Sequence, residues 1–413
     1  MKPLRKKVYV TAGYYTVSLG SGRKEFHPKK PRPGLEHYIL EAGKGAISQI
    51  EHPEQIDEGI ITNFMMARYN RQGNRPGFFP TIHPSFRYKP ATGVEGACGS
   101  GGLGLVVACK TILADVADAV LVIGVEVQNT VKAVYGADYL AGAGWFKERK
   151  KGHAHFFPGQ FSDRTGACFE KFGKERVREG MAHWYVQAIE HARKNPKAQE
   201  YHNTAENLFE LAMTPPNPKV FCEHINVYDC SKVSDAGAAI IFASEEGLKK
   251  LGVAKKDAAE VVSWGQSEDD ITQPPPDLTK LTTTKKAVET AYERAGISIK
   301  DIGVLEVHDC FTISGLLSME AVGACGYGEA ADFVKEGRTR ANGELPTNTG
   351  GGLIGYGHPV GASGVRQAVD IWMQLTGKSP NQVKIDSDRP YGMLISMGGN
   401  DKTVVAMIFR KCE

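Results

Sequence analysis

The feature that most constrains this fold is a strand–helix–strand pattern that occurs twice along the chain. The predicted elements are a strand at 7–12, a helix at 40–50 and a strand at 59–63 in the first half, and a strand at 260–265, a helix at 285–295 and a strand at 303–307 in the second. Strands that alternate with helices form parallel sheets covered by helices. A pattern that occurs twice indicates an internal duplication. We therefore expect an α/β protein built from two duplicated βαβ-rich halves.

Each half continues with a glycine-rich turn, an apolar helix and one more strand. The turns contain Cys98 in the first half and His358 in the second, and the strands follow at 119–125 and 391–396. This correspondence places Cys98 and His358 at equivalent positions of the two halves.

The halves predict a division into residues 1–250 and 251–413. Residues 127–230 interrupt the first half with aromatic side chains and a predicted helix at 176–194, before the chain returns to a strand at 238–243. Their apolar and helical content is too high for a disordered linker. We interpret this region as an insertion into the first half.

Composition limits the classes of function. The chain has 413 residues, of which 41% are hydrophobic and 23% charged, with a net charge of only +3. These values are typical of a globular protein of two or three domains. The basic residues between Arg23 and Arg32 are interpreted as a solvated loop, and no basic block predicts nucleic-acid binding.

The sequence also predicts where the protein resides. No apolar stretch approaches the ~20 residues that span a bilayer, and the start lacks the apolar region of a secretory signal. The eight cysteines are scattered and form no Cys-x-x-Cys pair, which argues against a zinc site. We expect a cytoplasmic protein with free thiols, no metal and no membrane contact.

Cys98 lies between extended sequence and the apolar, helix-like run 99–108. This places it at a helix N-terminus, where free N–H groups and the helix dipole favour a thiolate. The same N–H groups can stabilise an oxyanion on a bound carbonyl. A small buried cysteine in a tight turn would show the same pattern, so Cys98 alone decides nothing.

His358 lies in a second glycine-rich loop, 350–359. If the halves pack about a pseudo-two-fold axis, this loop faces the turn at Cys98. The imidazole could then act as a base or as an ion-pair partner for the thiolate. A lone histidine is more often structural, and the repeat is what favours a catalytic role here.

His308, Asp309 and Cys310 end an apolar strand. The carboxyl ends of parallel strands are where such folds bind ligands. Strand alternation puts His308 and Cys310 on one face and Asp309 on the other. A histidine and a second cysteine could therefore act on one substrate, although an exposed strand end with incidental polar residues is the structural alternative.

Together these stretches resemble the thiolase superfamily. The pattern Gly-His-Pro-x-Gly-Ala-Ser-Gly at 357–364 is typical of thiolases. The run His-Asp-Cys-Phe at 308–311 resembles the sterol-carrier-protein type and its bacterial and archaeal acetyl-CoA acetyltransferase-like relatives. The resemblance covers essentially the whole chain. It implies the thiolase fold, a five-layered α-β-α-β-α core with a loop-domain insertion in the first half.

The resemblance also implies the roles of the site residues. Cys98 would be acylated to a thioester while His358 accepts its proton. Cys310 would move the proton at the carbon next to the thioester, and His308 would help bind the thioester oxygen. The backbone N–H groups of Cys98 and Gly398 would hold the oxyanion.

Position 396 supports this subtype. Many thiolases carry a catalytic cysteine there, whereas this chain has Ser396, as in the subtype in which Cys310 takes over that role. A Claisen condensation needs a positioned base and an oxyanion hole, and two thiols can divide the work without a metal.

The implied reaction is the CoA-dependent cleavage of a 3-oxoacyl-CoA, or the reverse condensation, in fatty or aromatic acid degradation. The partners would be acyl-CoA and coenzyme A as co-substrate, with no bound cofactor. A homodimer or tetramer is expected. Relatives with this strand-end motif often pair with a small zinc-ribbon/OB-fold companion protein.

One departure concerns Gly315. Relatives often carry Glu at this place after the strand-end cysteine. The missing side chain predicts extra space for a bulky, branched or aromatic acyl group, although a neutral change outside the pocket would look the same. The residues that bind CoA are not identified, and the basic run 147–151 is a candidate for contacts with its phosphates.

Two other classes of function are alternatives to a thiolase. Ketoacyl synthases of the third type use a Cys-His-Asn set and hydroxymethylglutaryl-CoA synthase uses Glu-Cys-His, and neither predicts this combination of motifs. A non-catalytic acyl-CoA-binding or scaffold subunit is the second alternative. The presence of Cys98, Cys310 and His358 together argues against it.

Overall fold

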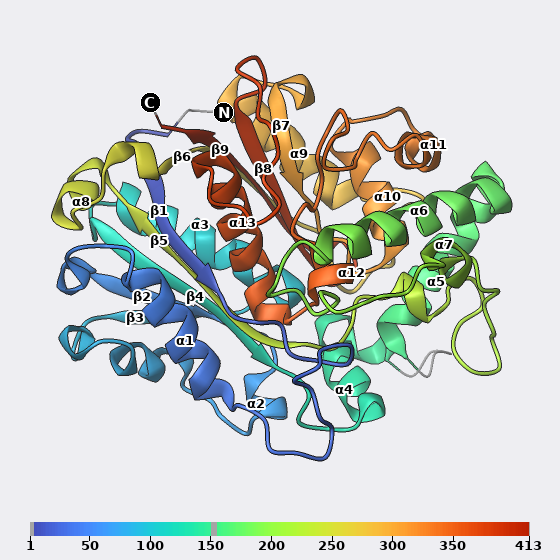
Figure 1. Cartoon of the computed structure of the whole chain (residues 1–413), viewed down its shortest axis with the longest axis horizontal. Coiled ribbons are helices and arrows are strands. Elements are labelled where there is room, and N and C mark those ends of the chain that lie inside the picture. The colour runs from blue at the N-terminus through green and yellow to red at the C-terminus, as the bar shows by residue number, and fades with distance from the viewer. Residues whose placement is uncertain (1–3, 150–154, 413) are drawn as a thin grey trace.

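A computed structural model describes residues 4–149 and 155–412. Within these residues a single nine-stranded sheet runs through the molecule in the order β3-β2-β4-β5-β1-β6-β9-β8-β7 (Figure 1). The strands are β1 (Val8–Tyr15), β2 (Glu58–Thr62), β3 (Ala91–Val94), β4 (Ala119–Val127), β5 (Asp235–Ala243), β6 (Ala259–Glu268), β7 (Ile302–Glu306), β8 (Tyr391–Gly398) and β9 (Thr403–Lys411).

The sheet consists of two similar parts. In the first, β2 is parallel to β4, and β5 lies antiparallel between β4 and β1. In the second, β7 is parallel to β8, and β9 lies antiparallel between β8 and β6. Among the described residues, the strands of the two parts pair where Val8–Val10 meet Ala259–Val261. This repetition confirms the predicted duplication and the α/β class.

The prediction of purely parallel sheets is wrong for one strand in each half. Only four residues, 399–402, connect β8 to β9. So short a connection joins antiparallel neighbours, since a parallel crossover needs a dozen or more residues. β5 takes the equivalent antiparallel place in the first half.

Helices separate and cover the two parts of the sheet. α3 (Ser100–Leu113) and α13 (Ser363–Thr376) contact each other and strands of both parts. α1 (Leu35–Ile47) covers the outer face of the first part, and α9 (Thr282–Ala295) covers that of the second. The layers therefore follow the order α-β-α-β-α, as the thiolase resemblance implied.

Burial on both faces explains the apolar sequence of the strands. Every residue of β4 and β5 is buried, and strands covered on both sides show nearly continuous hydrophobic runs. Leu105 of α3 and Val369 of α13 pack with Val122 and Leu394 in the central layer. The two central helices thus share one core with both parts of the sheet.

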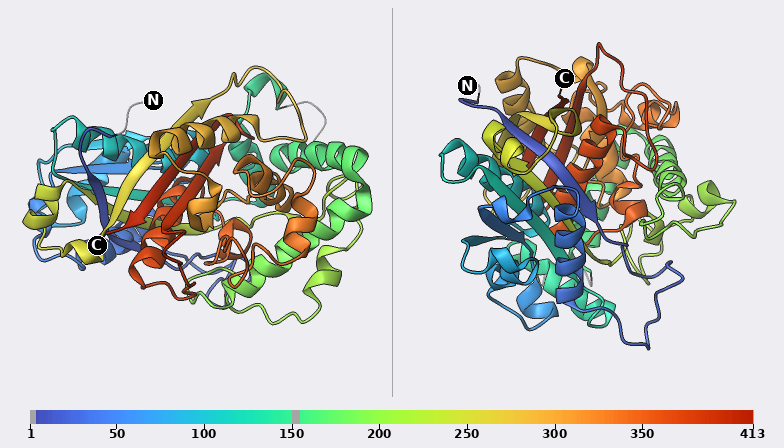
Figure 2. Two further views of the ribbon diagram at one scale, coloured as in Figure 1. Left: turned by 90° about the horizontal axis from the view of Figure 1, so that it is seen from above. Right: turned by 60° about the vertical axis from the view of Figure 1, so that its left-hand side comes forward.

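The segment predicted as an insertion lies between β4 and β5, at one end of the molecule (Figure 2). Its helix α6 contacts α10, α11 and α12 of the second half. The prediction of a boundary at 250/251 falls at the end of α8 and stays a prediction. The remaining helices are α2 (Met66–Tyr69), α4 (Ala133–Leu140), α5 (Phe156–Phe172), α6 (Lys174–Ala192), α7 (Leu208–Ala212), α8 (Glu245–Lys250), α10 (Thr312–Ala321), α11 (Ala330–Lys335) and α12 (Gly352–Tyr356).

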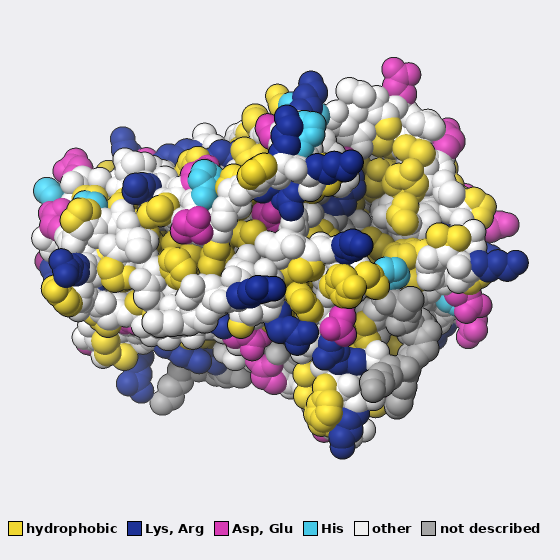
Figure 3. Space-filling model, turned by 90° about the horizontal axis from the view of Figure 1, so that it is seen from below, with side chains coloured by type: hydrophobic (Ala, Val, Ile, Leu, Met, Phe, Trp, Pro, Cys, Tyr) yellow, Lys and Arg dark blue, Asp and Glu magenta, His cyan; other side chains and the backbone are white. Residues whose placement is uncertain are grey.

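The surface shows mixed charge. On the face in Figure 3, basic side chains are interspersed with acidic and apolar ones. In the basic loop after β1, Lys29 and Lys30 are exposed as expected, but Arg23 is buried. Its guanidinium donates to the carbonyls of Pro196 and Ala198 at 2.9 Å. Among the described helices, none has the length and apolar character needed to cross a membrane.

The N-terminal ends of α3 and α13 touch backbone to backbone. A Cβ on Gly101 would lie 2.8 Å from the Cα of Gly364, and one on Gly364 would lie 2.6 Å from the nitrogen of Gly102. Atoms at these distances overlap, so the contact requires glycine on both helices. It holds the Cys98 turn beside the loop that carries His358.

Replacing Gly364 with Ala is expected to lower the free energy of unfolding by about 1–3 kcal/mol, because the added methyl group must push the two helices apart. Urea unfolding measures this loss. Gly73→Ala is the control, since a Cβ at Gly73 meets nothing within 4 Å. Equal stability of the two variants would contradict the close contact.

Candidate active site

Three side chains from distant parts of the chain meet at the start of α3. Cys98 contributes its sulfur, and His308 and His358 each contribute one ring nitrogen. These three atoms lie within 4.8 Å of one another. The two imidazole rings stand nearly perpendicular, with centroids 5.0 Å apart. The structure therefore brings together the residues that the duplicated pattern placed in facing loops. Such a donor set can also hold a metal, and the expectation that the site works without one stays a prediction.

Cys98 occupies a short 3-10 turn, Ala97–Gly99, directly before α3. Phe64 and Val360 pack around it. Burial in this environment raises the pKa of the Cys98 thiol to about 12, and the carboxylate of Glu126 adds to the rise. The prediction that the helix terminus favours a resting thiolate is therefore wrong, because the cost of desolvating the sulfur outweighs the helix dipole.

His358 is held in one tautomer by its neighbours. Its Nδ1 lies 2.7 Å from Oγ of Ser363, and the Ser363 hydroxyl donates to the carbonyl of Pro359. Since that hydroxyl hydrogen is already used, Oγ accepts from Nδ1–H, which leaves Nε2 as the free acceptor. Nε2 is buried and has no hydrogen-bond partner among the described residues.

The imidazole of His358 is neutral at physiological pH. Burial lowers its pKa to about 3, and the positive charge of Arg366 contributes. A neutral imidazole beside a neutral thiol favours the base role over a resting ion pair. His358 can take the Cys98 proton at the moment when the sulfur attacks.

His308 offers the complementary hydrogen-bonding pattern. Its Nδ1 accepts the N–H of Met397 at 3.4 Å, so the ring hydrogen is assigned to Nε2. Burial and the neighbouring His358 lower the His308 pKa well below its usual value. A neutral ring with Nε2–H can donate a hydrogen bond to a substrate oxygen.

The structure ends β7 at Glu306, so His308, Asp309 and Cys310 follow the strand instead of ending it, and the prediction of strand alternation over these residues is wrong. Asp309 contacts groups other than those around His308. Its Oδ2 accepts the indole N–H of Trp184 at 3.0 Å, and its Oδ1 accepts the N–H of Leu353 at 2.6 Å. Burial raises the Asp309 pKa to about 6. Asp309 thus ties the insertion helix α6 and the start of α12 to the strand end that carries His308.

Cys310 is buried beside the group of three. Its sulfur lies 3.8 Å from Oγ of Ser314. Burial raises the pKa of its thiol well above the usual value, and the nearby Cys98 is the next cause. The Cys310 thiol therefore keeps its proton on the sulfur at rest.

Gly398 ends β8 against the Cys98 turn. A Cβ on Gly398 would lie 2.7 Å from the nitrogen of Gly99 and 3.2 Å from that of Cys98. Only glycine permits this approach. Ser396 on the same strand is fully buried, and its Oγ accepts the N–H of Gly102 at 3.3 Å. Ser396 therefore has a structural role, because its hydroxyl joins β8 to α3.

Glu126 is a functional candidate that the sequence reasoning missed. It is completely buried at the end of β4, and its carboxylate accepts the N–H groups of Phe64, Met65 and Gly361 at 2.9–3.0 Å. Gly361 belongs to the loop of His358, and Phe64 packs against the Cys98 turn. In the sequence, Glu126 could have been identified as the single carboxylate in an otherwise apolar strand.

Gly315 opens no space. A Cβ at this position would collide with the indole of Trp184, which is fully buried. The prediction of a pocket enlarged at Gly315 is wrong, because a tryptophan from the insertion fills the volume. Of the basic run 147–151, residues 150 and 151 lie outside the described residues. Lys147 stacks on Trp145, with its ammonium 5.6 Å from the ring centroid.

Comparisons with known proteins place this geometry in context. Residues 265–411 match the family model "Thiolase C-terminal domain-like". The chain is 31% identical over 395 residues to an acetyl-CoA acetyltransferase of Methanocaldococcus jannaschii, covering 94% of this chain and 96% of the relative. It is 28% identical to the benzoylsuccinyl-CoA thiolase subunit BbsB of Thauera aromatica, covering 91% of both.

Solved structures share the fold. An Ltp2–ChsH2(DUF35) aldolase matches with a TM-score of 0.76 at 20% identity, covering 99% of this chain and 98% of that one. Human mitochondrial 3-ketoacyl-CoA thiolase in complex with CoA matches with a TM-score of 0.71 at 20% identity over the full length of both chains. At this identity the likeness concerns the fold alone.

Replacing Glu126 with Gln is expected to change how stability depends on pH. Burial raises the Glu126 pKa from 4.5 to about 7, so the folded state holds a proton that the unfolded chain has released. The stabilisation from this proton is present below pH 4.5 and is lost as the pH rises to about 7, a change of about 3 kcal/mol. Between these pH values the variant should gain that amount relative to the wild type.

Urea unfolding at a series of pH values measures this difference. Glu246→Gln, at an exposed position on α8, is the control and should follow the wild type at every pH. Parallel curves for the wild type and Glu126→Gln would contradict the raised pKa.

Proposed function

We propose that this chain cleaves or forms 3-oxoacyl-CoA through a thioester at Cys98. The chain belongs to the sterol-carrier-protein-type branch of the thiolase superfamily and is an acyl-CoA acyltransferase. The observation that carries this proposal is the meeting of the Cys98 sulfur with ring nitrogens of His308 and His358 within 4.8 Å. Coenzyme A is the co-substrate.

In the first step the Cys98 sulfur attacks the carbonyl carbon of the acyl group while its proton passes to Nε2 of His358. The free, buried acceptor on His358 supports this role. In the direction of cleavage, the carbon–carbon bond next to the carbonyl breaks and the acyl group stays on Cys98. The leaving carbanion equivalent takes a proton from the Cys310 thiol.

Two groups of donors stabilise the negative charge that develops on oxygen. Nε2–H of His308 donates to the thioester oxygen of the leaving acyl-CoA, whose enolate carries charge. The N–H groups of Cys98 and Gly398 bind the oxyanion on the carbonyl that the sulfur attacks. The close approach of Gly398 to the Cys98 turn supports this pairing. Free CoA then takes the acyl group from Cys98: the CoA thiol proton restores the Cys310 thiol, and His358 returns its proton to the Cys98 sulfur as the thioester bond breaks.

The proposals on cellular location, companion protein, oligomeric state and pathway rest on separate observations. All eight cysteines are free thiols, which suits a reducing compartment such as the cytoplasm. A relative named a thiolase subunit, and a fold neighbour whose name pairs Ltp2 with the DUF35 protein ChsH2, support a small companion protein. A homodimer or tetramer and a role in fatty or aromatic acid degradation follow the family pattern. A non-catalytic scaffold subunit is the alternative that the experiments below exclude or establish.

Acyl-enzyme trapping tests the nucleophile. Incubation with acetyl-CoA and with linear, branched and aromatic 3-oxoacyl-CoA thioesters should leave an acyl group on Cys98, found by peptide mass spectrometry. Cys98→Ser should lower turnover at least about a thousandfold. Cys325→Ser, which removes a half-buried thiol outside this site, should keep full activity. Absence of acylation with every thioester would establish the scaffold alternative.

Proton exchange separates the role of Cys310 from that of Cys98. Cys310→Ser should still form the acyl-enzyme, but it should slow the exchange of acetyl-CoA methyl protons with D2O by about 10²–10⁴-fold, because the acid/base group is lost. Mass spectrometry of recovered acetyl-CoA measures the exchange. His358→Asn serves as the contrast and should slow acylation itself. Unchanged exchange in Cys310→Ser would assign the proton transfer to another group.

A further inference from the structure

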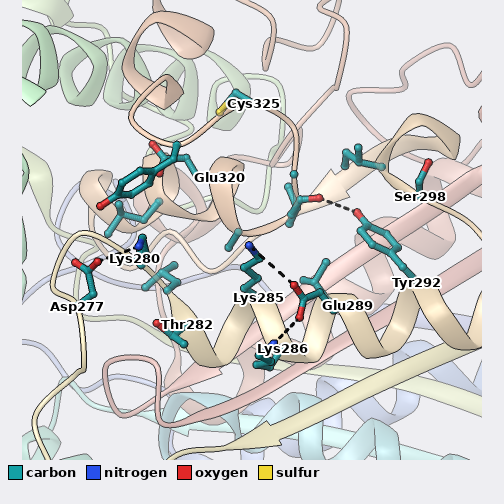
Figure 4. Close-up of a pocket in the computed structure, with 18 of the residues that line it drawn as sticks. Asp277, Lys280, Thr282, Lys285, Lys286, Glu289, Tyr292, Ser298, Glu320 and Cys325 are labelled. Atoms are coloured by element: carbon teal, nitrogen blue, oxygen red, sulfur yellow. Dashed lines mark hydrogen bonds and ion pairs between the residues drawn. The ribbon is translucent and has the colours of Figure 1, made fainter. Parts of the chain in front are cut away.

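A groove of about 890 Å³ lies between α9 and the C-terminal part of α10 (Figure 4). None of the five residues proposed for catalysis lines it, and all five are among the described residues. Its volume falls within the range of about 300–1,000 Å³ that is typical of small-molecule sites. Nothing in the proposed reaction uses this groove.

The floor of the groove is apolar. Leu281, Val288, Leu317 and Ala321 line it and belong to one buried cluster that lies beneath α9 and α10. The wall residue Tyr292 donates its hydroxyl hydrogen to the carbonyl of Val322 at 3.1 Å, which leaves its ring to face the groove. A concave apolar surface of this kind favours a ligand with an apolar body.

Three lysines stand along the α9 side of the groove. Figure 4 shows the ammonium groups of Lys280 and Lys285 between Asp277 and Glu289. Lys280 lies 3.2 Å from Asp277, whereas Lys285 and Lys286 share the single carboxylate of Glu289 at 3.9 and 3.0 Å. All these side chains are about a third or more exposed, and ion pairs at such positions contribute little and exchange partners readily.

The remaining charges leave the groove cationic. The third carboxyl, Glu320, is turned to the backbone N–H groups of Gly328 and Ala330, and burial raises its pKa to about 7. Lys171 adds an ammonium group 5.0 Å from the ring centroid of Tyr327, which also lines the groove. Ionised lysines therefore outnumber ionised carboxylates around an apolar floor.

We propose that this groove binds an amphipathic carboxylate, a small molecule with an apolar chain or ring system and one carboxylate head group. The apolar body covers Leu281, Val288 and Leu317. The head group replaces Asp277 at Lys280 or Glu289 at Lys285. The site is separate from the catalytic residues, so it stands or falls independently of the proposed reaction.

Calorimetric titration of the full chain with decanoate tests the proposal, in the presence of saturating CoA so that the catalytic site is occupied. One equivalent of decanoate should bind. Decanol, which lacks the charge, and acetate, which lacks the chain, should each bind at least about tenfold more weakly. Binding of decanol as tight as that of decanoate would overturn the assignment of a carboxylate head group.

Two variants locate the site. Lys280→Glu/Lys285→Glu should weaken decanoate binding by about tenfold, because two favourable charge interactions become repulsive. Thr282→Trp, which places a large ring on the groove wall, should weaken it at least as much. Lys255→Glu/Lys256→Glu, an exposed pair outside the groove, is the matched control and should bind like the wild type. Urea unfolding checks that every variant folds.

Thiol protection gives an independent readout. Cys325 lines the groove, so decanoate should slow its alkylation by iodoacetamide, while Cys222, which does not line it, should react at an unchanged rate. Displacement of decanoate by CoA would place binding in the catalytic site and overturn the proposal. Equal affinity of the wild type and both groove variants would do the same.

Discussion

The contact between the N-terminal ends of α3 and α13 is the constraint on which the site depends. Gly101 and Gly364 meet at backbone distance, so the turn before one helix lies beside the loop before the other. These segments carry Cys98 and His358. A side chain on either glycine would push the two segments apart, whereas a proton transfer needs its donor and acceptor within about 3 Å of each other. The catalytic geometry thus follows from packing in the central layer.

Burial then sets the chemistry of the meeting groups. Arg366 is fully buried and pairs with Glu306 and Asp370. Burial and, to a lesser extent, the positive charge of Arg366 lower the pKa of His308 and His358 and keep both rings neutral, while burial raises the pKa of Cys98 and keeps its thiol protonated. The resting site therefore holds no separated thiolate–imidazolium charges. In the proposed reaction, charge develops only as the sulfur attacks, and the N–H groups of Cys98 and Gly398 would stabilise it there.

The sequence could predict what depends on pattern and could not predict what depends on packing. Periodicity and repetition revealed the duplication and the pairing of Cys98 with His358. The antiparallel direction of β5 and β9 was not predicted, because strand direction follows from connections across the whole sheet. The thiol pKa was predicted with the wrong sign, since local sequence shows the helix terminus but not the burial. Trp184 beside Gly315 lies 131 positions away in the chain, and no local signal joins them.

Divergence between the duplicated halves explains how symmetric parts form an asymmetric site. In the first half the loop after β2 is held by a side chain on β4, because Glu126 accepts the N–H groups of Phe64 and Met65. In the second half the loop after β7 is held by the backbone of β8, because Met397 donates to His308. The junction is supported by a carboxylate in one half, whereas in the other half it carries His308, for which we propose substrate binding. The duplicated halves thus share one scaffold but hold equivalent loops by different contacts.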